Sequence, residues 1–172
     1  MQEKFTLDAV ARFGLEDMHC PVIPTPTSVV FEELDESCLL DKAEQKVYME
    51  KVGTLNYLTT QTRADVSWAV SKLGMYMQQA DAHVMKICDR VYAYLHGTAD
   101  TTTVFRRQAN GLTIIAYSDA SHADAGKCRN GRRRSQSGCC ILMCGAAIQY
   151  HSRGQESICK STVEVEYMYL ES

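Results

Sequence analysis

The sequence predicts a mixed α/β fold in which a helical segment precedes a short antiparallel sheet. From about residue 42 to residue 97, apolar residues recur at intervals of three and four, the period of an amphipathic helix. After Gly97 the period changes, and runs rich in β-branched and aromatic residues are separated by turn signals. Of the 172 residues, 45% are hydrophobic, so the chain can bury a core in one domain or in two small ones.

The first 41 residues predict a short helix followed by extended chain. Apolar residues between Phe5 and Phe13 can share one side of a helix, which Gly14 would close. All three prolines lie in residues 20–27, where they exclude helix and favour an extended segment. Residues 28–41 are acidic and have no clear period, so we expect a linker there.

Residues 42–99 predict three helices joined by short polar turns, which together make a small helical layer. Asp65 is expected to cap the second helix, and Trp68 fits the apolar side that faces the core. Gly97 is expected to end the third helix.

Residues 100–172 predict an α/β domain that stops early, with three antiparallel strands and the start of a helix. The dipeptide Asn110-Gly111 is a strong hairpin signal, and Lys127 to Arg134 form a basic loop. The predicted elements are a β-branched run at 101–105, strands at about 112–118, 137–144 and 146–151, and a helix that begins at Ser161.

The composition limits the classes of function. The net charge of −3 gives no global attraction to nucleic acid, so such binding has to come from a local cluster. Arg129 and Arg132, Arg133 and Arg134 form one, and on sequence alone it is either a phosphate-binding site or a solvated loop.

The sequence also lacks membrane and export signals. No apolar run approaches the roughly 18–20 residues of a membrane span, and the N-terminus has no signal-peptide core. We therefore expect no membrane partner and an intracellular location, cytoplasmic or nuclear and not secreted.

The eight cysteines include no C-x-x-C pair, which argues against zinc and thioredoxin-like sites. Cys139, Cys140 and Cys144 lie in one apolar run, where we expect small buried hydrophobes. Disulfides are not expected in a chain without a signal peptide.

Two carboxylates are candidate metal ligands. Asp119 ends an apolar strand, and by the two-residue period it shares a face with Ile115 and Tyr117. Glu166 lies on the apolar side of the final helix, where an unpaired acid would be costly. A helix packed on that face of the sheet could bring Glu166 near Asp119, and two such carboxylates suit Mg²⁺.

Purely structural roles remain open for the carboxylates. An aspartate at a strand end is often only a turn residue, which applies to Asp119, and Asp124 is expected to be part of a solvated loop. Glu164 forms an S-x-x-E capping box with Ser161, which accounts for it without a functional role.

Seven short segments follow one another in an order that resembles a known family. Four of them are Tyr117-Ser-Asp-Ala-Ser121, Arg133-Arg-Ser-Gln-Ser-Gly138, Ala147-Ile-Gln-Tyr-His-Ser152 and Ser161-Thr-Val-Glu-Val-Glu-Tyr-Met168. They resemble the elements YSDADWAG, DRRSTSGY, ISWSS and SSTEAEYMA in the RNase H portion of copia-type retrotransposon Pol polyproteins. The earlier segments Val52-Gly-Thr-Leu-Asn-Tyr-Leu58, Thr62-Arg-Ala-Asp-Val66 and Tyr94-Leu-His-Gly-Thr98 look like that family's VGSLLYL, TRPDI and YLKGT elements. Residues 12–17 and 24–26 look like the tail of its reverse transcriptase.

The resemblance implies three parts: the reverse-transcriptase tail and linker (1–41), a helical connection segment (42–99), and an incomplete RNase H-like fold (100–172). It further implies an RNase H-type endonuclease that cuts the RNA strand of an RNA–DNA hybrid with two Mg²⁺ ions. By motif match, Asp119 is the first-strand metal ligand and catalytic residue, and Glu166 is the helix ligand.

The sequence also departs from the family. It contains no YxDD polymerase motif, and the fourth strand with its metal-binding Asp would follow Ser172. Ser121 stands where the family often has a second Asp, and His122 where it has an aromatic residue. We therefore expect a remnant with an incomplete catalytic site, weak Mg²⁺ binding through two carboxylates, and negligible hydrolysis by this chain alone.

Two further expectations follow. In the family fold the first strand pairs with the fourth, so residues 112–118 would form an exposed edge that is open to self-association. The alternative hypothesis is a non-catalytic nucleic-acid-binding or interaction module on the same scaffold, supported mainly by Arg129 and Arg132 to Arg134.

Overall fold

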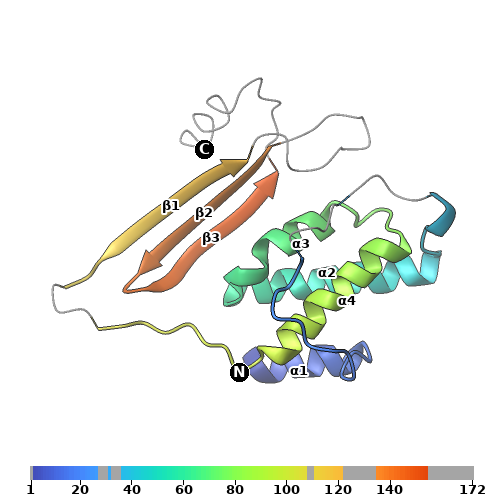
Figure 1. The fold of residues 1–172 in the computed structure, drawn as a ribbon, viewed down its shortest axis with the longest axis horizontal. Coiled ribbons are helices and arrows are strands. Elements are labelled where there is room, and N and C mark those ends of the chain that lie inside the picture. Colours follow the sequence, from blue (N-terminus) through green and yellow to red (C-terminus); the bar gives the residue numbers. More distant parts are fainter. Residues whose placement is uncertain (1, 27–30, 32–35, 108–110, 122–134, 155–172) are drawn as a thin grey trace. The chain divides into compact units, whose positions relative to one another are not determined.

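The computed structural model describes residues 2–26, 31, 36–107, 111–121 and 135–154. The chain divides into two compact units, here called the helical unit (Met1–Thr102) and the sheet unit (Thr103–Ser172), and each is described by itself (Figure 1). Within the described residues, no helix has both the length and the apolar character needed to cross a membrane.

The helical unit contains the helices that the sequence predicts. The first ends before Gly14, whose φ of 65° is the left-handed conformation typical of a residue that closes a helix. Residues 42–97 form the other three helices, as predicted. The helices are α1 (Gln2–Arg12), α2 (Lys42–Gln61), α3 (Ser67–Gly74) and α4 (Ala82–Gly97), with 3₁₀ turns η1 (Glu36–Cys38) and η2 (Ala64–Val66).

Aspartates begin the two longest helices. The Asp41 carboxylate accepts hydrogen bonds from the N–H groups of Ala43 and Glu44, and the Glu44 carboxylate accepts one from the Asp41 N–H. This reciprocal pair is a capping box. At the start of α4, Asp81 accepts from the Val84 N–H at 2.8 Å. The predicted linker 28–41 therefore ends in a residue that fixes where α2 begins.

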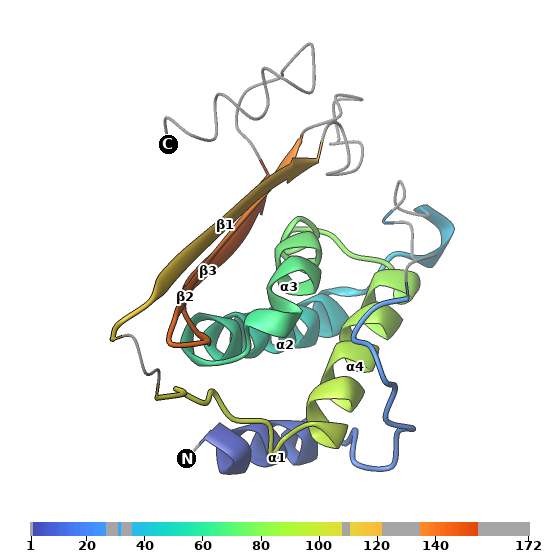
Figure 2. The same cartoon turned by 60° about the vertical axis from the view of Figure 1, so that its left-hand side comes forward.

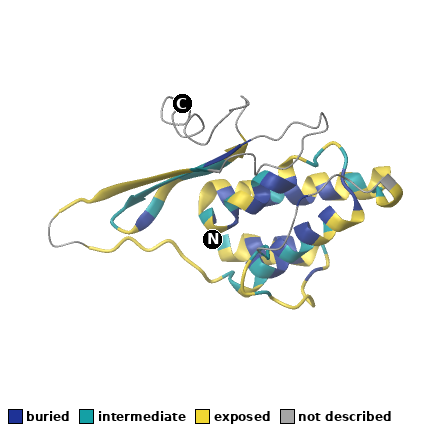
Figure 3. Ribbon diagram, turned by 45° about the horizontal axis from the view of Figure 1, so that its top comes forward, coloured by how far each residue is buried: buried dark blue, intermediate teal, exposed yellow. Residues whose placement is uncertain are grey.

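The core of the helical unit lies where its helices face one another, and Figure 3 shows the exposed residues on the outer sides. Two tyrosines are fully buried there, and each finds a backbone acceptor. The Tyr48 hydroxyl donates to Leu73 O at 2.6 Å, and the Tyr92 hydroxyl donates to Lys51 O at 2.8 Å. Burial raises the pKa of both phenols, so they stay neutral donors.

Two predictions for this unit are wrong. Asp65 does not cap α3; it lies inside η2, and its carboxylate is engaged by Arg63 and Tyr94. Trp68 is 36% exposed and lies at the margin of the core, with its ring edge-on to Phe31 at 5.7 Å between centroids. Helical period places a residue on a side of a helix, but the width of the neighbouring layer decides how deeply it is buried.

The sheet unit contains three antiparallel strands, as predicted, in the order β1-β2-β3 (Figure 1), and Figure 2 shows the same sheet nearly edge-on. The strands are β1 (Ile114–Ser121), β2 (Gln136–Met143) and β3 (Ala146–Gly154). Cys144 and Gly145 join β2 to β3, and their φ values of 52° and 80° are those of a type I′ hairpin turn. That turn twists in the same sense as the strands, and it fixes their register.

The structure corrects several details of the sheet. Residues 101–105 form no strand, and β1 begins and ends later than the predicted 112–118. Cys144 belongs to the turn, and Cys139, Cys140 and Cys144 are half-buried free thiols and not buried hydrophobes. The predicted helix that begins at Ser161 lies outside the described residues.

Two helical glycines, Gly53 and Gly97, give a matched test of the packing. A Cβ at Gly97 would lie 2.7 Å from the Cβ of Cys20, whereas a Cβ at Gly53 would meet no described atom within 4 Å. Gly97→Ala is expected to lower the free energy of unfolding by about 1–3 kcal/mol through overpacking. Gly53→Ala is expected to raise it by about 0.5–1 kcal/mol through helix propensity. Urea unfolding followed by helical circular dichroism measures both, and shifts of the same sign would contradict the close approach of Cys20 to α4.

Candidate metal site on the first strand

Asp119 lies near the end of β1, with its side chain exposed. The ladder places it directly opposite Gly138 of β2, which in turn pairs with Ser152 of β3. Residues directly opposite one another point to the same face of a sheet. Gly138 has no side chain, and among the described residues a Cβ built there would meet only the main-chain oxygens of Asp119 and His151, at 4.0 Å, so the described part of the sheet leaves room beside Asp119 on this face.

The face that carries Asp119 changes character along the strand. Ile115 and Tyr117 share this face, as the two-residue period predicts, and both are exposed. Toward the end of β1 the face becomes polar, and Gln136 Nε2 donates to Ser152 Oγ at 2.7 Å. Asp119 therefore lies at the polar end of an otherwise apolar strand face.

The other predicted site residues lie outside the described residues. These are Glu166 and the arginines Arg129, Arg132, Arg133 and Arg134. The proximity of Glu166 to Asp119 therefore stays a prediction. In the part of the chain that the structure describes, no three His, Cys, Asp or Glu side chains are placed so that they could hold a metal ion.

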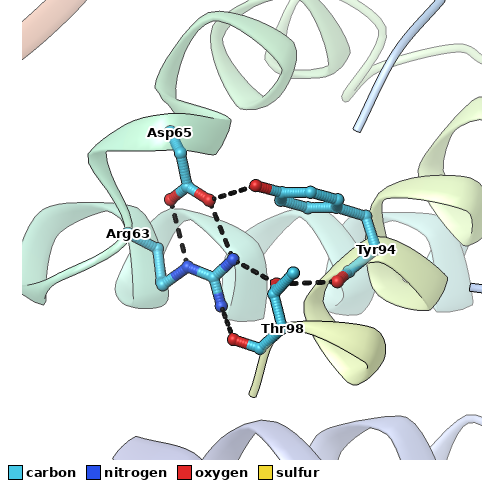
Figure 4. Close-up of polar contacts among 4 residues, drawn as sticks. All are labelled: Arg63, Asp65, Tyr94 and Thr98. Carbon is cyan, nitrogen blue, oxygen red and sulfur yellow. Dashed lines mark hydrogen bonds and ion pairs between the residues drawn. The ribbon is translucent and has the colours of Figure 1, made fainter. Parts of the chain in front are cut away.

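A second polar cluster, which the sequence interpretation missed, lies in the helical unit (Figure 4). The Arg63 guanidinium donates to both carboxylate oxygens of Asp65, at 3.0 and 2.8 Å. It also donates to the carbonyl oxygen of Thr98 at 3.0 Å and to the Thr98 hydroxyl at 2.6 Å. The Tyr94 hydroxyl donates to Asp65 at 2.8 Å, which closes the cluster. We call these four residues the Arg63 cluster.

The electrostatics of the Arg63 cluster are those of a structural ion pair. Arg63 is only 4% exposed. Burial disfavours the charged form of Asp65, but the hydrogen bonds from Arg63 and Tyr94 outweigh it, so the pKa of Asp65 lies below its ordinary value. The guanidinium also meets a carbonyl at the C-terminal end of α4, where a positive charge complements the helix dipole.

The signal that could have revealed this cluster was present in the sequence. Arg63 and Asp65 belong to one segment that resembles the family, and Tyr94 and Thr98 belong to another. Tyr94 and Thr98 are four residues apart, so they lie on one side of α4. The two segments are joined by side-chain hydrogen bonds, and their role in this unit is to hold it together.

Removing the Arg63 side chain tests this role. Arg63→Leu is expected to lower the free energy of unfolding by roughly 2–3 kcal/mol, because it strips a buried carbonyl and a carboxylate of charged donors. Arg12→Leu, which removes an exposed ion pair with Glu50, should cost less than about 1 kcal/mol. Since the folded-state pKa of Asp65 is depressed, its contribution is complete above about pH 5 and is lost as the pH falls through the folded value. Urea unfolding at several pH values should show the Arg63→Leu deficit shrinking in acid, and a deficit no larger than that of Arg12→Leu would contradict the role.

The sequence was compared with protein families, known proteins and solved structures. No family model matches it, and no solved structure matches it. The Pol polyprotein of transposon RE2 from Arabidopsis thaliana is 31% identical over 96% of the chain, and that of transposon RE1 from the same plant is 28% identical over 96%. The secreted RxLR effector protein 161 of Plasmopara viticola is 31% identical over 72% of the chain and 83% of its own length. The chain spans only 11% of the length of the RE1 and RE2 polyproteins. Its similarity along nearly its full length means that this chain belongs to the retrovirus-related Pol polyproteins of copia-type retrotransposons, as one segment of them.

Proposed function

We propose that this Pol segment runs from the end of a reverse transcriptase into the first part of an RNase H-like domain. The observation that carries the proposal is the exposed Asp119 on the first strand of a three-stranded antiparallel sheet, opposite a glycine. The resemblance to the RNase H portion of copia-type Pol polyproteins predicts a carboxylate at this position of the first strand. The related activity is hydrolysis of the RNA strand of an RNA–DNA hybrid.

Asp119 and Glu166 are the proposed Mg²⁺ ligands. The surroundings of Asp119 suit a hydrated cation, because Gly138 places no side chain beside the carboxylate and the strand end is polar. Mg²⁺ prefers oxygen ligands and keeps several of its waters, so it needs such room. When bound, the ions of such a site activate a water molecule and stabilise the leaving oxygen of a phosphodiester. Asp119 would hold one of the ions at the end of β1.

We further propose that the isolated chain hydrolyses negligibly. The candidate set comprises two carboxylates, Asp119 and Glu166, and two ligands hold a pair of divalent ions poorly. Each Mg²⁺ takes six oxygen ligands in an octahedral arrangement, so water would have to supply nearly all the ligands of both ions. The chain is then a remnant with a weak metal site and not a working nuclease.

The proposed partner is an RNA–DNA hybrid, with Arg129 and Arg132, Arg133 and Arg134 as phosphate contacts. These four arginines lie within six residues, and the net charge of −3 offers no other general attraction to a polyanion. The alternative hypothesis, a non-catalytic nucleic-acid-binding module, also requires binding without cleavage, so binding alone does not separate the two hypotheses. Binding of Mg²⁺ at Asp119 separates them, because only the RNase H-like hypothesis requires it.

The metal site is tested with the 172-residue chain, an RNA–DNA hybrid and Mg²⁺. We expect no cleavage above the buffer rate, and Mg²⁺ binding that Asp119→Asn weakens roughly tenfold, about the loss of one charged ligand contact. Asp124→Asn is the matched control and should leave binding unchanged. Titration followed by nuclear magnetic resonance measures both. Robust cleavage that Asp119→Asn abolishes would overturn the proposed inactivity, and identical affinities of the two variants would overturn the metal role.

The partner is tested by the salt dependence of hybrid binding. Replacing Arg129 and Arg132 to Arg134 by alanine is expected to lower the slope of log K against log salt by up to about 3–4. The control is the double variant Arg106→Ala, Arg107→Ala, which removes two positive charges outside the loop, Arg106 lying beside the turn between β2 and β3, and it should leave the slope nearly unchanged. Fluorescence anisotropy at several salt concentrations gives both slopes. An unchanged slope in the first variant would rule out the loop as the contact.

A further inference from the structure

The two edges of the sheet are not equally protected. On the β3 side, Ile148 forms a bulge against the Ile141–Leu142 step of β2, and the exposed Arg153 follows. Bulges and charged side chains are the usual devices that keep an edge strand from pairing with another chain. On the β1 side the ladder to β2 is unbroken over all eight residues, and β1 contains no proline, lysine or arginine.

The outer edge of β1 presents specific main-chain groups. The carbonyl of Thr113 accepts from the Cys144 N–H at 3.0 Å, so residue 113 turns toward the β2 side. Main-chain groups alternate in direction along a strand. The odd-numbered residues of β1 therefore bond to β2, and the even-numbered ones turn their N–H and C=O outward: Ile114, Ala116, Ser118 and Ala120. No described residue pairs with these outward groups.

The side chains next to this edge are apolar and exposed on both faces of the strand. Ile114 is 59% exposed on one face, and Ile115 and Tyr117 are 44% and 57% exposed on the other. An edge that combines unpaired main-chain groups with exposed apolar side chains can bind another extended, apolar strand, because such a strand supplies both the hydrogen bonds and the apolar contacts.

We infer that the outer edge of β1 binds a second copy of this chain through its own β1, antiparallel, with Ala116 on the twofold axis. In this register Ala116 pairs with Ala116, and Ile114 pairs with Ser118. All of these residues have outward-facing groups, so the pairs exchange roughly six main-chain hydrogen bonds. Ile115 then lies across from Tyr117 twice, in the closer type of pair, and a β-branched residue opposite an aromatic one is a stabilising combination.

The charge of Asp119 disfavours two of the other registers. Asp119 is the only charged residue of β1. A register centred on Asp119 would place two carboxylates opposite one another, and one centred on Tyr117 would place each carboxylate opposite Ile115. With Ala116 on the axis, Asp119 lies opposite Thr113, whose hydroxyl can donate to it. The inference rests on the sheet alone and does not depend on the proposed nuclease ancestry.

The experiment measures the mass of the full 172-residue chain by sedimentation over a range of concentrations. The native chain is expected to dimerise, and Ala116→Pro is expected to weaken the dimer roughly 100-fold, because proline removes an outward N–H without touching the ladder to β2. Ala116→Val keeps the N–H and should dimerise as the native chain does. Hydrogen exchange of the Ile115 and Tyr117 amides reports whether β1 and β2 remain paired in each variant.

Contacts between copies provide a second readout. In a mixture of labelled and unlabelled chains, Tyr117 ring protons should show nuclear Overhauser contacts to Ile115 of the other copy. A chain that stays monomeric, or a dimer that Ala116→Pro leaves intact while β1 and β2 remain paired, would overturn the inference. A monomer whose Ala116 and Ser118 amides are slow to exchange would show that another segment of the same chain occupies the edge, and would overturn it equally.

Discussion

The arrangement of the helical unit depends on the buried guanidinium of Arg63. Arg63 comes from the turn that joins α2 to α3, and it donates to the carbonyl and the hydroxyl of Thr98, the residue that follows α4, so one side chain ties that turn to the end of α4. The ion pair with Asp65 offsets the cost of burying the guanidinium, because an unpaired charge at that depth would cost several kcal/mol. The segments around Arg63 and Tyr94 look like family motifs, and in this unit their side chains form structural hydrogen bonds with one another.

The sheet unit depends on a different constraint, the register of the β1–β2 ladder. The type I′ turn at Cys144-Gly145 fixes the register of β3 against β2. The pairing of β1 with β2 then fixes which residue of β2 lies opposite each residue of β1. That register sets Asp119 against a glycine at the polar end of the strand. A slip of one residue would turn Asp119 to the opposite face, so the position of the candidate ligand is a consequence of strand pairing and not of any contact made by its carboxylate.

The sequence predicted elements better than contacts. The period of three and four located the helices, and the two-residue period placed Ile115, Tyr117 and Asp119 on one face, because both periods follow from backbone geometry alone. Asp65 was misassigned because a short acid before an apolar run suits both a helix cap and an ion pair, and only the buried Arg63 decides between them. Residues 101–105 have strand propensity, but propensity yields a strand only where a partner strand is available.

We propose that Asp119 and Glu166 are ligands of one metal site inherited from an RNase H-like domain. Mn²⁺ in place of Mg²⁺ broadens the resonances of nuclei close to it, so it tests this claim directly in the full chain. We predict that a small amount of Mn²⁺ broadens the amide signals of Asp119 and Glu166 together, and that excess Mg²⁺ or Asp119→Asn restores both. Broadening at one residue without the other, or at neither, would contradict the claim.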